Sequence, residues 1–257
     1  MAGALLSVRF RLGDDGMKVI SFHAVHYGLP YLEASIRSVV DAVDQVCIIY
    51  TPIGSHGARS TMPCPDSRDD LLRIASNAAG SKLFWREGVF HSEGHHRGAV
   101  HHYVPDADLI LVCDSDEAFK ESELEMLLNT AANGNVRNYL AYEYPFWRNF
   151  RKAIPDRLCQ PVRAINTRFS DGTQGTDAYF SHFGYCQPTK YIKAKMEIHG
   201  HRADWRPEWF ETKWLTNAQV DVHPTNHNFW NTQDVNPLDH MPLWMAEHPY
   251  FNLDLIP

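Results

Sequence analysis

Two aspartates one residue apart follow an apolar run and are the clearest candidates for chemistry in this chain. The run 109–113 reads LILVC, and Asp114, Ser115, Asp116 and Glu117 come directly after it. Three acids within four residues repel one another unless a cation or a base lies among them. A hard divalent cation, Mg²⁺ or Mn²⁺, would relieve this repulsion and keep coordination positions for the oxygens of a substrate phosphate. The alternative is an exposed acidic loop that caps the following helix, because a D-x-D triplet alone is a weak signal.

The elements that must position this motif alternate between strands and helices. Strands are expected at 19–25, 45–51, 82–86 and 109–113, and helices at 32–42, 69–79, 94–103 and 122–132. This alternation indicates a parallel sheet with crossover helices, and the fourth strand is apolar on both faces, as a central parallel strand is. Ligands of such sheets gather at the carboxyl ends of the strands. The acidic motif is therefore expected at the ligand-binding edge.

The pattern changes beyond residue 136, where aromatic residues and histidines become dense and clean periodicity is lost. A long strand is expected at 136–147 and a helix at 189–199. The tail from residue 221 onward is rich in Pro, Asn and His, and it is expected to wrap the fold as ordered loops.

The bulk composition fits one α/β domain, with or without an appended C-terminal part. With 257 residues, of which 44% are hydrophobic, the chain can bury a sizeable core. A formal net charge of -7 argues against a surface coated in positive charge for nonspecific binding to nucleic acid or membranes. Five cysteines without a C-x-x-C pair fit reduced, buried thiols. There is no apolar run of about 18 residues and no signal peptide in the first residues, so a cytoplasmic location is expected.

Three segments carry a family resemblance. They are the segment 18–52, with VISFHAVHYGLPYLEASIRSVVDAVDQVCIIYTP, the segment 94–117, GHHRGAVHHYVPDADLILVCDSDE, and HFGY at 182–185. Together they resemble the large inverting family of GT-A glycosyltransferases over about residues 17–200, and the D-x-D placed after a strand is the most specific part. The resemblance implies an α/β fold of the GT-A (Rossmann-like) type, with a mostly parallel central sheet flanked by helices and an irregular C-terminal extension.

The resemblance implies a metal-dependent hexosyltransferase that moves a sugar from a nucleoside-diphosphate sugar to an acceptor hydroxyl, with inversion. Asp114 would contact the donor ribose or the metal, and Asp116 would ligate the Mn²⁺ or Mg²⁺ directly. A third metal ligand is often a histidine from the second half of such chains. His182 is the first choice and His223 the second, ahead of His199, His201 and His227, although any single histidine is more often structural.

Donor-binding residues are also implied by the resemblance. Arg97 would pair with a donor phosphate through its planar fork, unless it is an ordinary surface arginine of its helix. Tyr27 and Thr51, which follow the first strand and end the second, would contact the donor. The acidic residue that usually follows the second strand is absent from 51–56. A UDP-sugar is the favoured donor.

Inverting transfer needs a carboxylate that takes the proton of the acceptor hydroxyl. The usual Glu-Asp pair near the end of the catalytic half has no recognisable counterpart here. The candidates for the catalytic base are Asp177 and Glu143. Asp177 could equally cap a turn, and Glu143 could be an ordinary strand residue paired with Arg148.

Two segments bear on the acceptor, which is expected to be a glycan or a small molecule. Six basic residues and a single acidic one occur within 148–168, a bias that suits an acidic acceptor or a nucleic-acid backbone but also a solvated face. This bias keeps open a hydroxymethylated DNA base, the acceptor of some viral enzymes of this kind. Aromatic residues crowd 139–150, where Tyr144 and Trp147 suit a sugar or a base, although an ordinary core strand has the same composition.

The expected organisation is an N-terminal extension at 1–16, a nucleotide-sugar-binding half at 17–135, an acceptor and catalytic half of the same domain at 136–215, and a wrapping tail at 216–257. Two other functions compete with this one. A zinc-dependent hydrolase is suggested by the histidine pairs at 95–96, 101–102, 199–201 and 223–227, but no H-E-x-x-H box occurs. A catalytically inactive donor-binding module is disfavoured by the intact pair Asp114 and Asp116.

Overall fold

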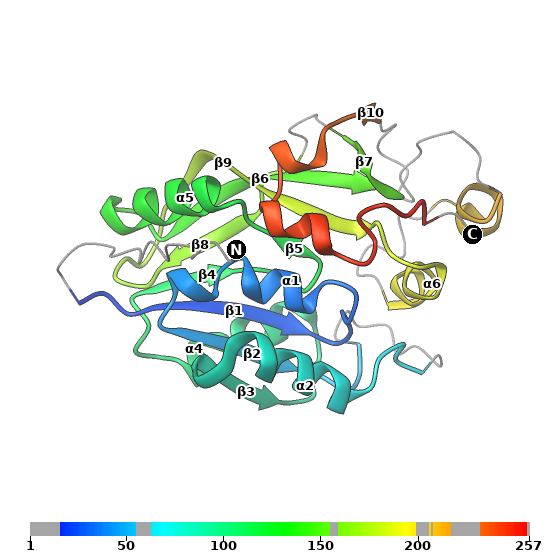
Figure 1. The fold of residues 1–257 in the computed structure, drawn as a ribbon. Coiled ribbons are helices and arrows are strands. Elements are labelled where there is room, and N and C mark those ends of the chain that lie inside the picture. The colour runs from blue at the N-terminus through cyan, green and yellow to red at the C-terminus, as the bar shows by residue number, and fades with distance from the viewer. Residues whose placement is uncertain are drawn as a thin grey trace, which may run out of the picture.

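The structure is a computed structural model, and it describes residues 16–54, 63–154, 159–198, 206, 208–216 and 232–255. Four parallel strands form one half of its central sheet. These strands are β1 (Val19–Val25), β2 (Gln45–Tyr50), β3 (Leu83–Glu87) and β4 (Leu109–Val112). Strand β1 lies between β2 and β4, and β3 forms the outer edge (Figure 1).

The other half of the sheet is largely antiparallel. It contains β6 (Asn138–Trp147), β7 (Asn149–Ala153), β8 (Val162–Asn166) and β10 (Gln233–Asp234), which complete the order β10-β7-β6-β8-β4-β1-β2-β3. Strand β8 runs antiparallel to β4 and so joins the two halves. The long strand β9 (Thr173–Tyr185) pairs in parallel with β6, and the two-residue strand β5 (Glu117–Ala118) pairs antiparallel with β9.

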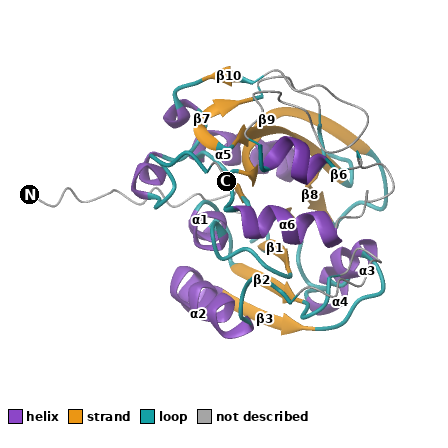
Figure 2. Cartoon of the chain, turned by 90° about the vertical axis from the view of Figure 1, so that its right-hand side faces the viewer, coloured by secondary structure: helices purple, strands orange, loops and turns teal. Residues whose placement is uncertain are grey.

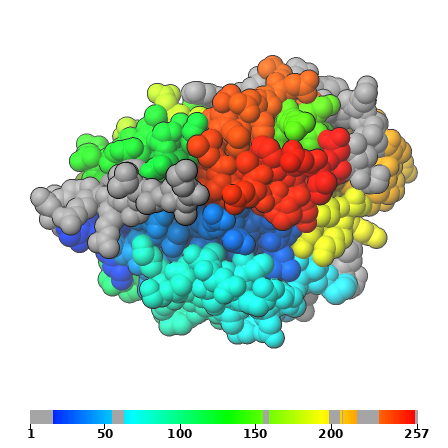
Figure 3. All heavy atoms as spheres, viewed as in Figure 1, coloured from blue at the N-terminus to red at the C-terminus, as the bar shows by residue number. Residues whose placement is uncertain are grey.

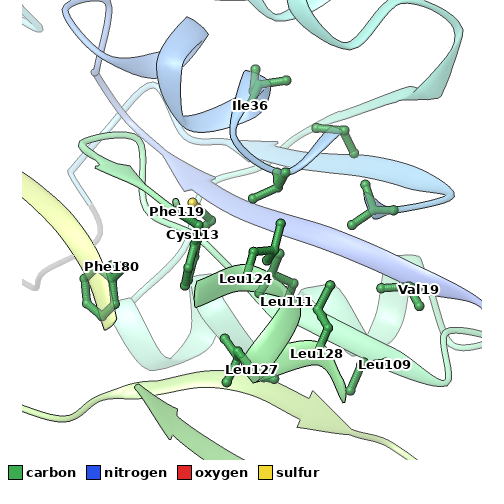
Figure 4. Close-up of a cluster of buried hydrophobic side chains, with 14 of the residues drawn as sticks. Val19, Ile36, Leu109, Leu111, Cys113, Phe119, Leu124, Leu127, Leu128 and Phe180 are labelled. Carbon is green, nitrogen blue, oxygen red and sulfur yellow. The ribbon is translucent and has the colours of Figure 1, made fainter. Parts of the chain in front are cut away.

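Helices cover both faces of the parallel half. The helices are α1 (Leu32–Arg37), α2 (Arg68–Ala79), α3 (Glu93–Gly98), α4 (Val100–Tyr103) and α5 (Glu121–Asn133). Because successive strand residues point to opposite faces, Ile48 of β2 packs with α1, α2 and α5, whereas Ile49 packs with α4. Figure 4 shows part of the first cluster, where Leu124 and Leu128 approach Leu111 of β4.

The C-terminal part of the described chain is irregular and packs across the sheet. Two short 3₁₀ helices, Pro237–Asp239 and Leu243–Glu247, place Met241 and Met245 in a buried cluster with Phe146 and other aromatic residues. In Figure 3 these orange and red residues lie between the green atoms of α5 and the blue atoms of α1. Helix α6 (Thr189–Ile198) follows β9.

The expected fold class is confirmed, since a central sheet with a parallel half flanked by helices precedes an irregular C-terminal part. The helix expected at 32–42 ends early, because Ser38 Oγ donates to the carbonyl oxygen of Ser35 and Val39 leaves helical geometry. The helix expected at 94–103 is divided after Gly98 into α3 and α4. All five cysteines are free. In the described ranges, no helix has the length and apolar character to span a membrane.

Candidate active site

The D-S-D motif forms the turn between β4 and β5, at the carboxyl edge of the parallel strands. The backbone N–H of Asp114 donates to Glu117 Oε2 at 3.0 Å, and the N–H of Glu117 donates to the carbonyl oxygen of Asp114 at 3.2 Å. The pairing of β5 with β9 sets Glu117 opposite His182. Figure 2 is viewed toward this edge, and α6 crosses the middle of the view. The short strand β5 thus brings residues of β9 to the acidic motif.

Asp114 is engaged by two arginines. Arg97 Nη1 and Nη2 donate to Asp114 Oδ1 and Oδ2 at 2.8 and 2.9 Å, and Arg97 Nε also donates to Glu93. Arg163 of β8 lies 3.6 Å from Asp114 Oδ2 and is hydrogen-bonded to the buried Glu117. Burial alone would raise the pKa of Asp114, but the two guanidinium groups hold it well below its usual range. Asp114 is therefore ionised, with both oxygens held in a bidentate pair.

Asp116 faces a different set of groups. His182 Nε2 lies 3.6 Å from Asp116 Oδ2, Lys195 Nζ of α6 lies 4.0 Å from it, and Gln187 Nε2 donates to it at 3.3 Å. On the other side of the imidazole, His182 Nδ1 is hydrogen-bonded to the Glu143 carboxylate on β6. Burial disfavours the charged imidazole, yet Glu143 and Asp116 together raise the pKa of His182 to about 10. The imidazole is therefore cationic at neutral pH.

Two glycines permit the close packing of this site. A Cβ at Gly184 would lie 2.7 Å from His182 Nε2 and 2.7 Å from Lys195 Nζ, so any side chain there would require these two groups to shift. Gly28, with φ of 151°, stands where a Cβ would lie 2.4 Å from Ser115 Oγ. Ser115 Oγ donates to the carbonyl oxygen of Tyr27 at 3.1 Å, which ties the acidic turn to the loop after β1.

Asp66 holds the same loop from the other side and was missed by the sequence analysis. Its Oδ2 accepts the backbone N–H groups of Gly28 and Leu29 at 2.8 and 2.9 Å, and its Oδ1 accepts the hydroxyl of Tyr191 on α6. The ring of Tyr27 lies 6.1 Å from that of Tyr191. An Asp between Pro65 and a helix resembles an ordinary helix-start residue, so its type and position carried no signal for this role.

Thr51 lies at the end of β2 as expected, but its side chain is committed to the backbone. Thr51 Oγ1 donates to the carbonyl oxygen of Ile53 at 2.7 Å, and the carbonyl oxygen of Thr51 lies 2.8 Å from His26 Nδ1. A contact between Thr51 and a ligand would therefore need a rearrangement of this turn.

The predicted site residues divide into those that meet and those that do not. Asp116, His182 and Glu143 meet in one cluster, whereas Asp114 turns away to Arg97. Asp177 is exposed on β9, five residues before His182, which is about 16 Å along an extended strand. The expectations for His199, His201, His223 and His227 fall outside the described residues.

The expected metal trio of Asp114, Asp116 and His182 does not stand together. Within the ranges that the structure describes, no three His, Cys, Asp or Glu side chains are grouped as a metal site. The same finding leaves the histidine pairs at 95–96 and 101–102 without the grouping that a zinc hydrolase needs. His96 is buried, and its Nε2 lies 2.7 Å from the carbonyl oxygen of Ile49.

A divalent cation nevertheless fits the pair Asp116 and His182. Two atoms 3.6 Å apart can both lie about 2.1 Å from one ion, and a cation there would replace the proton on Nε2. Glu143 on Nδ1 completes a carboxylate–histidine arrangement that fixes the ring with Nε2 toward Asp116. Mg²⁺ and Mn²⁺ sites commonly use one or two protein ligands with substrate phosphates and waters.

The basic stretch 148–168 does not gather on one surface. Arg148 is buried and donates to the carbonyl oxygens of Lys213 and Trp214, and Arg163 points into the site. Arg168 donates to Asn166 and to the carbonyl oxygen of Ala132. Arg157 lies outside the described residues. Arg148 and Arg163 thus serve internal contacts, whereas Arg151, Lys152 and Arg168 are exposed.

The aromatic residues of β6 belong mainly to the core. Trp147 is buried against Tyr185, Trp209 and Trp214. Tyr144 is half-buried and stacks on the ring of His240 at 4.0 Å between centroids. Trp147 is therefore an ordinary core residue of the strand, whereas Tyr144 packs against the C-terminal part of the chain.

Comparison with known proteins leaves the family of this chain open. No family model matches it, and a search of curated proteins finds no match. Among solved structures, 4-diphosphocytidyl-2C-methyl-D-erythritol synthase from Anaerococcus prevotii has 12% identity and a TM-score of 0.44, covering 70% of this chain and 95% of that chain.

Glucosyl-3-phosphoglycerate synthase from Mycobacterium tuberculosis is also similar. Its complex with Mg²⁺ and UDP has 16% identity and a TM-score of 0.37, covering 50% of this chain and 44% of that chain. Its complex with Mn²⁺, UDP-glucose and phosphoglyceric acid has a TM-score of 0.35, 16% identity, and coverage of 51% and 44%. This chain thus spans less than half the length of those synthase chains, and likenesses this distant do not assign a family.

Proposed function

We propose that this chain is a metal-dependent glycosyltransferase of the GT-A kind, which moves a hexosyl group from a nucleoside-diphosphate sugar, a UDP-sugar by preference, to an acceptor hydroxyl with inversion. One observation carries the proposal. An ionised Asp116 meets His182 and Lys195 at the carboxyl edge of a parallel sheet, where ligands of α/β folds bind. Residues 17–135 would bind the donor and residues 136–215 the acceptor, with an N-terminal extension at 1–16 and a tail at 216–257 that wraps the domain.

The metal ligands in this proposal are Asp116 and His182. The bound Mn²⁺ or Mg²⁺ would act as a Lewis acid toward the leaving diphosphate. Glu143 holds His182 through Nδ1, and the backbone of Gly184 leaves room for the imidazole. The imidazole is therefore already oriented toward Asp116, and cation binding would have to displace the proton on Nε2 but would need little movement of the ring.

Asp114 and Arg97 have a shared role in the proposal. The bidentate pair fixes the Asp114 carboxylate as an ionised acceptor at the end of β4. Such an acceptor suits the ribose hydroxyls of a nucleotide better than a cation. Arg97 then positions Asp114, and its role as a phosphate partner, implied by the family resemblance, becomes secondary. Tyr27 would border the nucleotide from the loop after β1, and Thr51 would do so from the end of β2 once its turn rearranges.

The base that takes the proton of the acceptor hydroxyl is proposed to be Glu143, with Asp177 second. Although burial would raise it, the pKa of Glu143 is lowered to about 2 by the protonated His182, so the carboxylate is ionised but only weakly basic. Loss of the imidazole proton to a bound cation would make Glu143 a stronger base. Asp177 is exposed at a distance along β9. The acceptor is proposed to be a glycan or small molecule, because internal contacts take up Arg148 and Arg163 of the basic stretch and so weaken the case for a modified DNA base.

The test is a thermal-shift screen with UDP, GDP and TDP, each with and without Mn²⁺, since a ligand that binds only the native state raises the melting temperature. We expect one diphosphate to stabilise the protein in the presence of Mn²⁺, and Asp116→Asn to abolish the part that depends on Mn²⁺. Transfer of labelled sugar to glycan, small-molecule and modified-DNA panels then identifies the acceptor. The absence of any nucleotide effect, together with an unchanged metal response in Asp116→Asn, would refute the proposal.

A further inference from the structure

Lys195 is a third group beside Asp116 and His182, and its sequence context indicates no role for it. It lies on α6, its side chain is only 15% exposed, and its Nζ is 4.0 Å from Asp116 Oδ2. The ammonium also stands over the ring of Tyr185, 4.9 Å from the centroid. A lysine of this low exposure at the edge of a sheet is placed by the fold rather than left in solvent.

The ammonium of Lys195 keeps its hydrogen-bonding capacity. A lysine carries three N–H donors. Across the described residues, no oxygen accepts a hydrogen bond from Nζ, and its contacts are the long ion pair and the aromatic ring. An anion that enters the site can accept hydrogen bonds from these donors, and hydrogen bonds between charged groups are among the stronger ones.

Neighbouring lysines on the same helix do not share this environment. Lys190 and Lys193 are exposed, whereas Lys195 lies one helical turn after the buried Tyr191 and on the same face. Gly184 leaves the space that Lys195 occupies, since a side chain at residue 184 would collide with both Nζ and His182 Nε2. The sequence therefore directs one lysine of α6, and not the others, toward the proposed metal ligands.

We propose that Lys195 binds the diphosphate of the donor directly, beside the cation held by Asp116 and His182, and stabilises it as the leaving group. In the transfer, the acceptor oxygen bonds to the anomeric carbon and the bond from that carbon to the β-phosphate oxygen breaks. The electron pair stays on that oxygen, and the acceptor proton goes to the carboxylate base. Lys195 places positive charge where negative charge develops. This inference rests on the proposed function.

Calorimetric titration of UDP in the presence of Mn²⁺ tests the inference, with uridine as the phosphate-free probe. We expect Lys195→Met to weaken UDP binding by roughly 10- to 100-fold, the effect of losing a hydrogen bond to a charged group. Uridine binding should stay unchanged, and Lys195→Arg should recover part of the UDP affinity. Lys193→Met is the matched control, and it should bind UDP within twofold of the unsubstituted protein.

The outcomes separate the inference from the function on which it rests. If the unsubstituted protein binds UDP and folded Lys195→Met binds it equally well, the role of Lys195 is wrong and the proposed function stands. If the unsubstituted protein binds neither UDP nor GDP nor TDP, the proposed function itself fails. Circular dichroism confirms folding, and Lys195→Gln replaces Lys195→Met should that variant not fold.

Discussion

His182 Nδ1 and the Glu143 carboxylate are hydrogen-bonded to each other across the parallel pair β6 and β9. The contact leaves Nε2 directed at Asp116, 3.6 Å away. One ring nitrogen is thus committed to the protein, and the other is presented at the edge of the sheet. The affinity of the site for a cation should therefore depend on the hydrogen bond between His182 Nδ1 and Glu143.

Glu143→Gln should weaken Mn²⁺ binding by roughly 10- to 100-fold, because outer carboxylates that orient a ligating histidine typically contribute this much. Electron paramagnetic resonance of free Mn²⁺ during a titration measures the dissociation constant without any enzymatic assay. Glu143→Asp should retain an intermediate affinity. The exposed Glu125→Gln on α5 is the control. An unchanged constant in folded Glu143→Gln would show that Glu143 does not position His182.

Gly184→Ala should disturb the site through its shape alone. The added Cβ would lie 2.7 Å from His182 Nε2 and from Lys195 Nζ, so both charged groups must move. We expect a loss of about 1–3 kcal/mol in the free energy of unfolding, typical of overpacking, together with weaker Mn²⁺ binding. Urea denaturation measures the first quantity.

Gly98→Ala supplies the matched control for that substitution. Gly98 is helical, and a Cβ there would meet nothing within 4 Å. Alanine has the higher helix propensity, so this variant should be neutral or more stable by up to about 1 kcal/mol. Equal destabilisation of the two variants would argue against a special packing requirement at Gly184.

The stability of the fold should decrease in mild acid because of His23 on β1. Burial lowers the pKa of His23 to about 4, against the smaller opposing effect of Asp114, and its ring nitrogens lie 3.2 and 3.3 Å from Ser35 Oγ and Ser21 Oγ. A lowered histidine pKa means that the unfolded chain binds the proton more tightly. The contribution of neutral His23 to the free energy of unfolding is therefore complete above pH 6.5 and is lost as the pH falls toward 4.

The size of this effect should be roughly 3 kcal/mol, because each unit of pKa difference corresponds to about 1.4 kcal/mol. Urea denaturation of the unsubstituted protein and of His23→Gln at several pH values between 7 and 4 measures it. The variant should start less stable at pH 7 and lose less stability on acidification. Parallel pH curves for the two proteins would contradict the assignment to His23.

Asp66→Ala should release the loop after β1. Two backbone N–H groups and the hydroxyl of Tyr191 would lose their acceptor, and unpaired buried groups typically cost about 1–3 kcal/mol each. We expect a lower melting temperature and a weaker thermal shift with UDP. The exposed Asp69→Ala should change neither quantity by much, since the ion pair of Asp69 with Arg68 lies at the surface.

The parallel half of the fold could be predicted because its strands are apolar on both faces and therefore visible as runs. Residues 19–25 and 109–113 illustrate this, and the end of the second run located Asp114 and Asp116 correctly at the carboxyl edge of the parallel strands. Strands β7 and β8 escaped prediction because they are short and carry charged residues, of which Arg163 of β8 is turned inward. Arg163 of β8 reads as a surface residue until its partner Glu117 is known.

The site itself was only partly predictable, because its partners come from distant parts of the chain. Resemblance pointed to His182, but nothing in the sequence indicates that Arg97 would occupy both oxygens of Asp114. Lys195 could not be distinguished from Lys190 and Lys193 without the pitch and placement of α6. Side-chain type and local pattern identify candidates, whereas long-range pairing decides which of them meet.

The two-residue strand β5 has a consequence for the order in which a growing chain can acquire this site. The acidic turn precedes β5, but the groups that face it come from β6, β9 and α6. A nascent chain that has emerged only as far as α5 holds the motif without its imidazole or its lysine. In the proposed site, cation binding should therefore begin during synthesis only after β9 has left the ribosome, and the diphosphate should bind only after α6 has followed, when Lys195 can fold back beside Asp116.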